Sequence, residues 1–354
     1  MYGGDVWMFC HISVTENRFP GDVEMSPPQS EVRLGELRIS PPLFLAPMAG
    51  LTHTALRSLL VELGGVGLLS TEMLSARTLP QENRHVSPYL KRGPEERPLS
   101  HQIFLGTVAE VAPAVEVLQK FGAEVVDINL GCPAPNIRKK GGGSRLSEQP
   151  DLVRLVVAEA KRHCSVPVTA KIRLGEDLNE EKLRDFCRML VDEGVDMITV
   201  HARLRREPFG RKARWEWVGK VKSWVQVPVI ANGGIFTVED ARKCLALSGA
   251  DGLMIGRAAA ITPWLFHEIA RDVYKIPLAA LHIDRPAIYQ RFVDLLNDRF
   301  APERRLGRLK EFSFYFSKNY PFGHNMAKAV QNSSSVEEAV GKAMDFFARH
   351  DSDA

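Results

Sequence analysis

The chain has few cysteines, and they form no pattern. Its 354 residues include only five, with no Cys-x-x-Cys pair: Cys10, Cys132, Cys164, Cys187 and Cys244. An odd, scattered set argues against a disulfide framework and against a structural zinc site, so we expect no metal. It also favours a reducing compartment, and we therefore expect a cytoplasmic location.

Long apolar runs and a strong excess of one charge are also missing. No run approaches the length of a membrane span, and the start of the chain lacks the basic and apolar regions of a secretory signal. We therefore expect no membrane partner. The formal net charge is +3, which alone implies no polyanionic partner. Basic residues are nevertheless clustered at 138–145, 203–214 and 299–310.

Each basic cluster has two interpretations. A run of charge is usually a solvated surface, but it can also contact the phosphates of a nucleic acid. For residues 203–214 we favour RNA, because this run starts at the end of a predicted strand.

Residues 1–32 contain turn-forming pairs such as Gly3-Gly4 and show no sustained hydrophobic period. We expect them to form a mobile N-terminal extension, with Met25 as an alternative natural start. The rest of the chain has an ordinary globular composition, 45% apolar and 25% charged overall. This length and composition suit one large domain and a smaller one.

Short apolar runs alternate with amphipathic stretches through most of the chain. The runs predict strands at 43–47, 66–71, 99–104, 124–130, 167–173, 196–201, 228–232 and 251–255. The intervening stretches predict helices at 52–63, 108–121, 150–163, 180–193 and 238–247. Strands alternating with helices form parallel sheets, and eight such units over about 240 residues match a TIM barrel. We predict an α/β fold with a TIM (β/α)8 barrel over residues 33–275, whose N-terminal mouth is capped by a hairpin at 32–40.

The strand signal ends near residue 275. Beyond it, residues 284–300, 302–318, 322–332 and 335–349 suit amphipathic helices. We predict a C-terminal helical bundle domain over residues 276–354.

Cys132 stands out because of where its segment breaks. Residues 124–130 form an apolar, β-branched run that Gly131 and Pro133 end abruptly. The thiol therefore lies just beyond the carboxyl end of a strand, where TIM barrels place their chemistry. A reactive thiol is the favoured interpretation, and an inert buried cysteine is the alternative. The following Gly141-Gly142-Gly143 lacks the residues of a Walker motif, and we interpret it as a flexible lid.

Nearly all of the remaining predicted strands also end beside residues that could contact a ligand. Packing alone does not explain so many of them. In chain order they are Pro47-Met48-Ala49, Glu72, Gln102, Asn129, Lys171 with Arg173, His201 with Arg203, Asn232-Gly233-Gly234, and Gly256-Arg257. The glycines and the arginine at the last two ends are typical of a phosphate site, although they could simply form tight turns. Lys171 lies in an apolar run and needs an anion or water. His201 by itself could be a hydrogen-bonded core residue.

With these residues assembled, the chain resembles the tRNA-dihydrouridine synthase family over roughly residues 33–350. The shared segments are Ala46-Pro47-Met48-Ala49-Gly50, Thr71-Glu72-Met73, Gln102-Ile103-Phe104, Asn129-Leu130-Gly131-Cys132-Pro133, Lys171-Ile172-Arg173, His201-Ala202-Arg203, Asn232-Gly233-Gly234 and Gly256-Arg257. The segment that includes Cys132, with the glycine-rich loop after it, is specific to this family. The segments at Pro47 and Asn232 occur in several flavin barrels.

The resemblance implies an FMN enzyme that reduces a specific uridine of tRNA to 5,6-dihydrouridine and is recharged by NADPH or NADH. Hydride would go to C6 of the uracil, and Cys132 would give the proton to C5. The cofactor would contact Pro47, Met48, Ala49, Gln102, Lys171, His201, Asn232, Gly233, Gly234, Gly256 and Arg257. The substrate would contact Asn129, Arg173 and Arg203. Residues 276–354 would dock tRNA, and we expect a monomer.

Some positions depart from the family pattern. After His201 the family commonly has Tyr, Gly, Ala, Asp and Trp, where this chain has Phe209, Arg211, Ala213, Arg214 and Trp215. Asn136 stands where the family often has lysine. These departures leave open which uridine is modified. Two other functions also stay open: a flavin barrel that acts on a free pyrimidine or enone, and an RNA-binding factor with little turnover.

Overall fold

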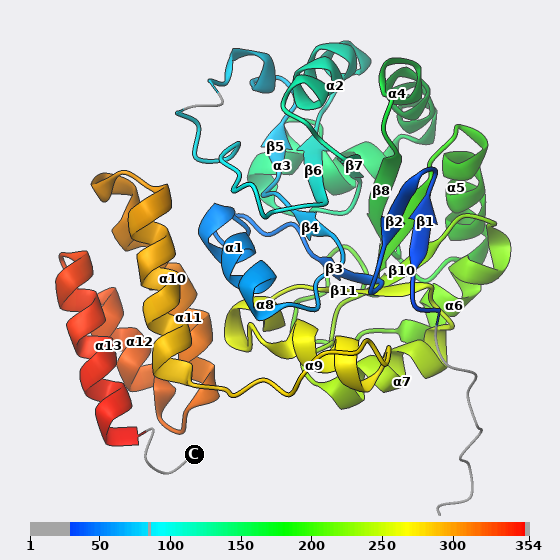
Figure 1. Ribbon diagram of the computed structural model, residues 1–354. Coiled ribbons are helices and arrows are strands. Elements are labelled where there is room, and N and C mark those ends of the chain that lie inside the picture. The colour runs from blue at the N-terminus through cyan, green and yellow to red at the C-terminus, as the bar shows by residue number, and fades with distance from the viewer. Residues whose placement is uncertain (1–28, 84–85, 351–354) are drawn as a thin grey trace, which may run out of the picture.

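The computed structural model describes residues 29–83 and 86–350, and a ring of parallel strands forms its centre (Figure 1). The ring consists of β3 (Leu43–Leu45), β4 (Leu69–Ser70), β6 (Leu99–Phe104), β7 (Val125–Asn129), β8 (Val168–Arg173), β9 (Met197–His201), β10 (Val229–Asn232) and β11 (Gly252–Ile255). Each strand pairs in parallel with its neighbour, and β11 pairs with β3. A bridge between Phe44 and Leu68 brings β3 beside β4. The prediction of a TIM barrel is confirmed.

The strands form where apolar residues can be buried on both sides. Every residue of β7 and β9 is buried, as expected when a parallel sheet is covered by helices outside and filled by side chains inside. The predicted strand 66–71 is shortened to β4 because the backbone at Gly67 turns towards Pro41. A Cβ on Gly67 would lie only 1.9 Å from the Pro41 carbonyl oxygen. A two-residue strand, β5 (Leu74–Ser75), continues beside β6.

A hairpin of β1 (Val32–Leu34) and β2 (Leu37–Ile39) covers the start of the barrel. Val32, Leu34 and Ile39 are buried against residues at or near the starts of the barrel strands, including Val125 and Met197. The predicted cap of the N-terminal mouth is therefore confirmed. Most of the predicted extension, residues 1–32, lies outside the described residues, and its last residue, Val32, begins β1.

Helices surround the barrel (Figure 1). They are α1 (Thr54–Leu63), α2 (Val111–Lys120), α3 (Pro135–Lys139), α4 (Pro150–His163), α5 (Glu180–Asp192), α6 (Trp215–Trp224), α7 (Val238–Ser248), α8 (Ala258–Ile261) and α9 (Leu265–Asp272). Helix α7 begins with a capping box: the Thr237 hydroxyl accepts from the Asp240 N–H, and the Thr237 N–H donates to the Asp240 carboxylate. Helix α6 was not predicted. No helix in the described ranges is long and apolar enough to cross a membrane.

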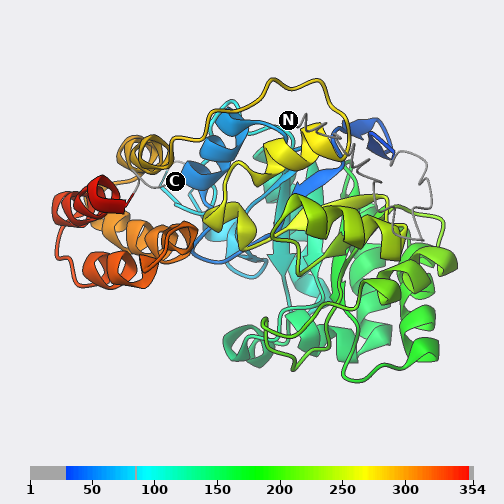
Figure 2. The same ribbon diagram turned by 90° about the horizontal axis from the view of Figure 1, so that it is seen from below.

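A bundle beside the barrel is formed by α10 (Arg285–Arg299), α11 (Arg305–Phe316), α12 (Gly323–Gln331) and α13 (Val336–His350) (Figures 1 and 2). The helical C-terminal region is therefore confirmed. Its core is aromatic, and the Phe292 and Phe312 rings stack with their centroids 3.8 Å apart. Tyr289 and Phe347 pack edge to face beside them.

Ion pairs join the bundle to the barrel. Arg291 of α10 pairs with Glu62 of α1 at 2.6 Å, and Arg299 pairs with Glu95 at 2.8 Å. Near these pairs, the fully buried Arg57 guanidinium forms an ion pair with Glu96 at 2.6 Å. These contacts hold the bundle in place, so α11 reaches the open end of the barrel.

Candidate active site

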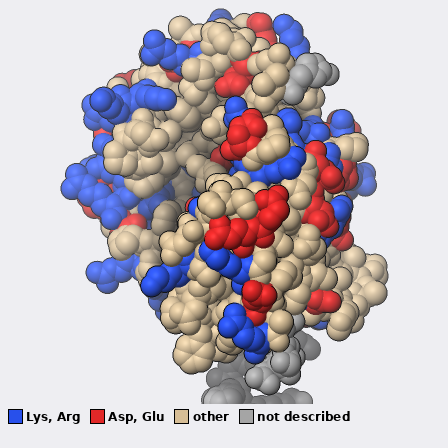
Figure 3. Space-filling view, turned by 90° about the vertical axis from the view of Figure 1, so that its left-hand side faces the viewer, with Lys and Arg blue, Asp and Glu red and all other residues tan. Residues whose placement is uncertain are grey.

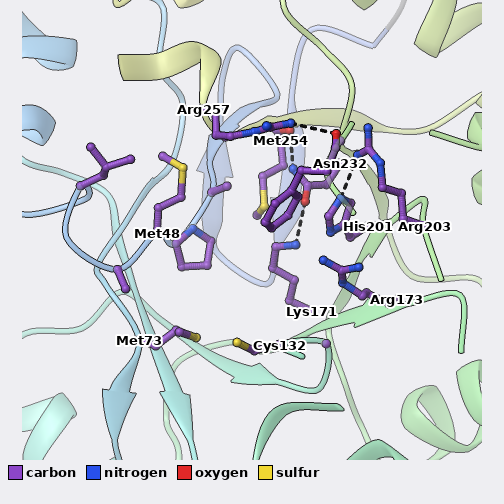
Figure 4. A pocket seen from close by; sticks show the side chains of 18 of the residues that line it. Met48, Met73, Cys132, Lys171, Arg173, His201, Arg203, Asn232, Met254 and Arg257 are labelled. Carbon is purple, nitrogen blue, oxygen red and sulfur yellow. Dashed lines mark hydrogen bonds between the residues drawn. The ribbon is translucent and has the colours of Figure 1, made fainter. Parts of the chain in front are cut away.

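A cavity of about 530 Å³ opens where the barrel strands end (Figure 4), and Cys132 and every residue predicted to contact the cofactor or the substrate line it. Glu72 lies outside this lining and accepts from the Gly50 N–H at 2.6 Å. The barrel brings the lining residues together because parallel strands deliver their carboxyl ends to one mouth. The sequence did not predict that the lining also includes Met73, Phe209, Phe236 and Met254, or that the C-terminal bundle takes part in it. The bundle contributes Glu311, Phe314, Tyr315 and Lys318 to the lining.

A chain of hydrogen bonds holds the turn that carries Cys132. The backbone N–H groups of Cys132 and Gly131 donate to Asn129 Oδ1 at 2.9 and 3.2 Å. Asn129 Nδ2 donates to Gln102 Oε1 at 2.7 Å, and Gln102 Nε2 donates to Asp127 at 2.6 Å. A backbone N–H can only donate, so the orientation of each amide in this chain follows from the Cys132 backbone.

The chain of hydrogen bonds ends on a buried acid. Asp127 accepts from Gln102 on one oxygen and from the Thr169 hydroxyl on the other, the latter at 2.5 Å. Burial raises the pKa of the Asp127 carboxyl, while both hydrogen bonds and the Lys171 charge act in the opposite direction. Through Gln102 and Asn129, Asp127 thus helps to hold the backbone turn that carries the Cys132 thiol.

Figure 4 places the sulfur atoms of Cys132 and Met73 on one side of the cavity, away from the cluster of cations. Asn129 links them, because its Nδ2 also contacts Met73 Sδ at 2.9 Å. The prediction that Gly141-Gly142-Gly143 forms a flexible lid was wrong. Gly142 and Gly143 are buried, and a Cβ on Gly143 would lie 2.5 Å from the Cys132 carbonyl oxygen. The glycines allow this segment to pack beneath the Cys132 turn.

Lys171 and Asn232 form the centre of the opposite side. The Lys171 ammonium donates to Asn232 Oδ1 at 2.7 Å, and Asn232 Nδ2 donates to the Met254 carbonyl at 2.8 Å. Burial lowers the pKa of Lys171 to about 8, although the charge of Asp127 raises it. A cation held by a neutral amide can still bind an anionic group in the cavity.

His201 is neutral in this environment. Burial lowers its pKa far below the usual range, and the nearby Lys171, Arg173, Arg203 and Arg257 lower it further. Arg203 lies 3.0 Å from His201 Nε2, and a guanidinium offers only donors, so Nε2 accepts. The proton therefore lies on Nδ1, which leaves a neutral donor at this position.

Arginine side chains hold the loop after β9 in place. Arg173 donates to the Leu204 carbonyl at 2.8 Å, and Arg203 donates to the Arg211 carbonyl at 2.7 Å. Arg214 and Glu207 form a bidentate pair, and the hydrogen bonds from Arg214 lower the pKa of Glu207 to about 2.

Ion pairs offset part of the charge of the basic clusters. Arg205 pairs with Glu148 and Glu176, and Glu148 also pairs with Arg138 and Arg145. Because three arginines share the single carboxylate of Glu148, these pairs match only a part of the positive charge at 203–214 and 138–145.

Glycines shape the side of the cavity near Arg257. Gly233 and Gly234 have φ of +101° and +81°, and a Cβ on Gly233 would lie 2.6 Å from the His201 ring. At Gly256, by contrast, a Cβ would make only ordinary contacts of 3.7 Å with Ala46 and Met48. Packing does not require this glycine, so the missing side chain leaves room in the cavity. The arrangement suits a phosphate between backbone N–H groups and a guanidinium.

Among solved structures, the fold is similar to histamine dehydrogenase from Rhizobium sp. 4-9, with a TM-score of 0.52, 12% identity, and coverage of 75% of this chain and 50% of that chain. It is also similar to a 2-naphthoyl-CoA reductase, with a TM-score of 0.52, 11% identity, and coverage of 69% and 52%. At this identity the likeness concerns the barrel fold alone.

Sequence comparisons give the family. Residues 44–340 match the dihydrouridine synthase (Dus) family, and the chain belongs to that family. It is 37% identical to the tRNA-dihydrouridine(16) synthase of Aquipseudomonas alcaligenes over 83% of this chain and 96% of that protein. It is 34% identical to the probable tRNA-dihydrouridine synthase 1 of Synechocystis sp., over 87% and 86%. It is 33% identical to the tRNA-dihydrouridine synthase B of Escherichia coli K12, over 90% and 100%.

Proposed function

We propose that this protein reduces a specific uridine of tRNA to 5,6-dihydrouridine, with FMN as cofactor and NADPH or NADH as electron donor. The observation that carries the proposal is that Cys132 lies in the same cavity as Lys171 and the site formed by Gly233, Gly234 and Arg257. Membership of the family supports the reaction. The names of the relatives support tRNA as the substrate.

The residues of the cavity fit FMN. Its volume lies within the range of sites that enclose a cofactor. Pro47, Met48 and Ala49 offer an apolar wall for the ring system, and Lys171 offers a cation for its polar edge. Asn232, Gly233, Gly234, Gly256 and Arg257 would hold the phosphate; beside Gly256 a Cβ would make only ordinary contacts, at 3.7 Å, with Ala46 and Met48. His201 would lie close to the ring system and to the substrate.

Gln102 has a more limited part than the sequence suggested. Its side chain is buried, Oε1 accepts from Asn129, and Nε2 donates to Asp127. The second hydrogen of Nε2 and the second lone pair of Oε1 remain for the cofactor. We propose that Gln102 contacts the cofactor in this way while also keeping Asn129 in place.

The reaction needs a hydride at C6 of the uracil and a proton at C5. Bound FMN, once reduced, supplies the hydride. Cys132 would donate the proton, since its S–H group lies in the same cavity as the proposed cofactor contacts. Asn129 holds the Cys132 backbone and so fixes the direction of the thiol. It can contact the uracil at the same time.

The cations of the site have separate roles. Lys171 stabilises negative charge at the edge of the cofactor, an effect that a buried, water-poor site strengthens. The N–H of neutral His201 can donate to a carbonyl oxygen without adding charge. Arg173 and Arg203 would contact the RNA where it enters, although both already hold the loop after β9.

The target base must leave its stack to reach this cavity, which costs a few kcal/mol. Contacts between RNA and residues 276–354 would offset that cost. The free cysteines among the described residues suit a reducing, cytoplasmic setting, and we propose that the protein acts as a monomer.

The test is to purify the protein, record its visible spectrum, and incubate it with NADPH and tRNA from cells that lack the modification. We expect a yellow protein that releases FMN on denaturation and adds two hydrogens to one uridine, as measured by mass spectrometry. A colourless protein that releases no flavin would contradict the proposal.

A further inference from the structure

The mouth of the cavity is lined by aromatic rings that remain open to solvent. Phe209, Phe236 and Phe314 are 52%, 38% and 45% exposed, and Tyr315 lies next to Phe314 on α11. We call these four residues the aromatic rim. Exposed phenylalanines are unfavourable in water, so a group of them at one opening indicates a binding surface.

Cations alternate with these rings. The Arg257 guanidinium lies 5.0 Å from the Phe209 ring and 5.4 Å from the Phe236 ring. The Lys318 ammonium lies 4.6 Å from the Phe314 ring and 5.0 Å from the Tyr315 ring. In each half of the aromatic rim, two rings thus share one cation, and the Arg173 guanidinium also lies 5.5 Å from the Phe209 ring.

The two halves come from different parts of the protein. Phe209 and Phe236 lie on loops that follow β9 and β10, whereas Phe314 and Tyr315 lie on α11 of the C-terminal bundle. Phe314 and Tyr315 pack edge to face at 5.2 Å, so one ring limits the movement of the other. The bundle therefore completes an opening that the barrel begins.

We propose that the aromatic rim stacks the unpaired bases on either side of the target uridine, so that the enzyme binds its substrate as a short single strand. This inference rests on the proposed function and extends it. When one base of a polynucleotide enters the cavity, its neighbours stay attached and must lie at the opening. Rings with interleaved cations suit them, because any base can stack on a ring while a cation contacts the phosphate.

The charge of the surrounding surface agrees with this occupant. The left part of Figure 3 is the surface that lies at the rear of Figure 1, on the side of the molecule opposite the β1–β2 hairpin. Lysine and arginine are the most frequent charged residues on this part of the surface. Asp and Glu gather towards the centre and right of the same face. A polyanion would approach from the basic side, which is the side of the open barrel mouth.

The nicotinamide cosubstrate is a less suitable occupant. It needs to reach the cofactor inside the cavity, and nothing in its chemistry requires two pairs of rings at the opening. RNA that delivers one base to the cavity does require contacts on both sides of it. The experiment below separates the two.

The first measurement is the Kd of the flavin-loaded protein for a short single-stranded RNA that contains uridine, read by fluorescence anisotropy. Phe314→Ala should weaken binding roughly five- to a hundredfold, the range found for loss of one stacked base. Phe314→Trp should restore it, because tryptophan keeps a stacking surface. Leu247→Ala is the control, since Leu247 is 59% exposed on α7 and lies outside both the cavity lining and residues 276–354.

The second measurement uses the same RNA with an abasic nucleotide beside the uridine. If stacking on Phe314 is the contact, the abasic RNA should bind the wild-type protein more weakly, and Phe314→Ala should then cause little further loss. A full additional loss from Phe314→Ala would show that the ring contacts something other than the base.

Two results would overturn the proposal. One is unchanged RNA affinity in Phe314→Ala with a raised KM for NADPH, which would assign the aromatic rim to the dinucleotide. The other is equal affinity for single- and double-stranded RNA of the same length. Because these are binding measurements, they stand apart from turnover: a protein that binds the RNA in this way but makes no dihydrouridine would contradict the proposed function alone.

Discussion

The floor of the cavity and its aromatic rim are built by different interactions. On the floor, the part of the cavity around Cys132, a continuous chain of hydrogen bonds runs from Thr169 to the Cys132 backbone and fixes the turn that carries the thiol. At the opening, half-exposed rings such as Phe314 contact cations and water, and few directional bonds fix them. A rigid floor suits a reaction that needs exact geometry, and an adaptable opening suits a flexible strand.

The largest expected effect of a single change lies on the floor. Cys132→Ala should lower the rate of dihydrouridine formation by about 10²- to 10⁴-fold, since it removes the acid. The variant should still hold flavin, measured by its visible spectrum, because Cys132 is not among the proposed cofactor contacts. Cys244→Ala is the control, as this buried cysteine lies in α7, outside the cavity lining. Unchanged turnover in Cys132→Ala would falsify the role of this thiol.

The next effect concerns the bundle that supports the opening. Phe312→Ala should lower the free energy of unfolding by about 3–5 kcal/mol, because Phe312 is fully buried and stacked on Phe292. Denaturant unfolding followed by circular dichroism would measure the change. Flavin content per folded molecule should stay the same. Loss of flavin from the folded variant would show that cofactor binding depends on the packing of the bundle, which the account does not predict.

A smaller effect comes from the cation opposite the thiol. Because the pKa of Lys171 is lowered to about 8, its charge is present below that pH and is lost as the pH rises through it. The rate of flavin reduction by NADPH without RNA, a step that does not use Cys132, should therefore fall above about pH 8. Lys171→Met should remove this pH dependence and slow the step by about 10²-fold at pH 7. A wild-type rate that does not vary between pH 7 and 9 would contradict the role of Lys171.

The smallest effect tests the end of the hydrogen-bond chain. Asp127→Asn can still accept from Gln102, and the Thr169 hydroxyl can reverse to accept from the new amide, so only a few-fold loss of activity is expected. Removing the charge of Asp127 should lower the pKa of Lys171 further and move the fall in rate to lower pH. Asp127→Ala leaves Gln102 Nε2 unpaired and should cost more than Asp127→Asn. Equal losses in both variants would argue against the chain.

The barrel mouth could be predicted from the sequence because strand ends have fixed positions in this fold. Residues such as Lys171, His201 and Asn232 follow apolar runs directly, and parallel strands bring them to one opening. Phe314 and Lys318 could not be found in this way. They lie in a helical segment far along the chain, and they reach the cavity only because α10 docks against α1 and residues 91–96 and α11 docks against α8.

The local sequence pattern also gave a wrong prediction where two segments of backbone lie close together. Gly141-Gly142-Gly143 has the composition of a mobile loop, yet Ser144 N–H donates to the Cys132 carbonyl at 2.9 Å and the glycines pack beneath it. In the basic run at 203–214, Arg205 and Arg214 pair with acids of the protein, and the predicted contact of this run with RNA stays a prediction. Composition does not show which partner satisfies a charge or why a position needs glycine.

The most direct test of the central claim is a single turnover without oxygen. The flavin-loaded protein is reduced with one equivalent of NADPH, mixed with unmodified tRNA, and followed by its visible absorbance while dihydrouridine is measured in quenched samples. The account predicts that the yellow colour returns at the rate at which dihydrouridine forms, with one modified uridine for each flavin. Return of the colour without dihydrouridine, or dihydrouridine without return of the colour, would contradict it.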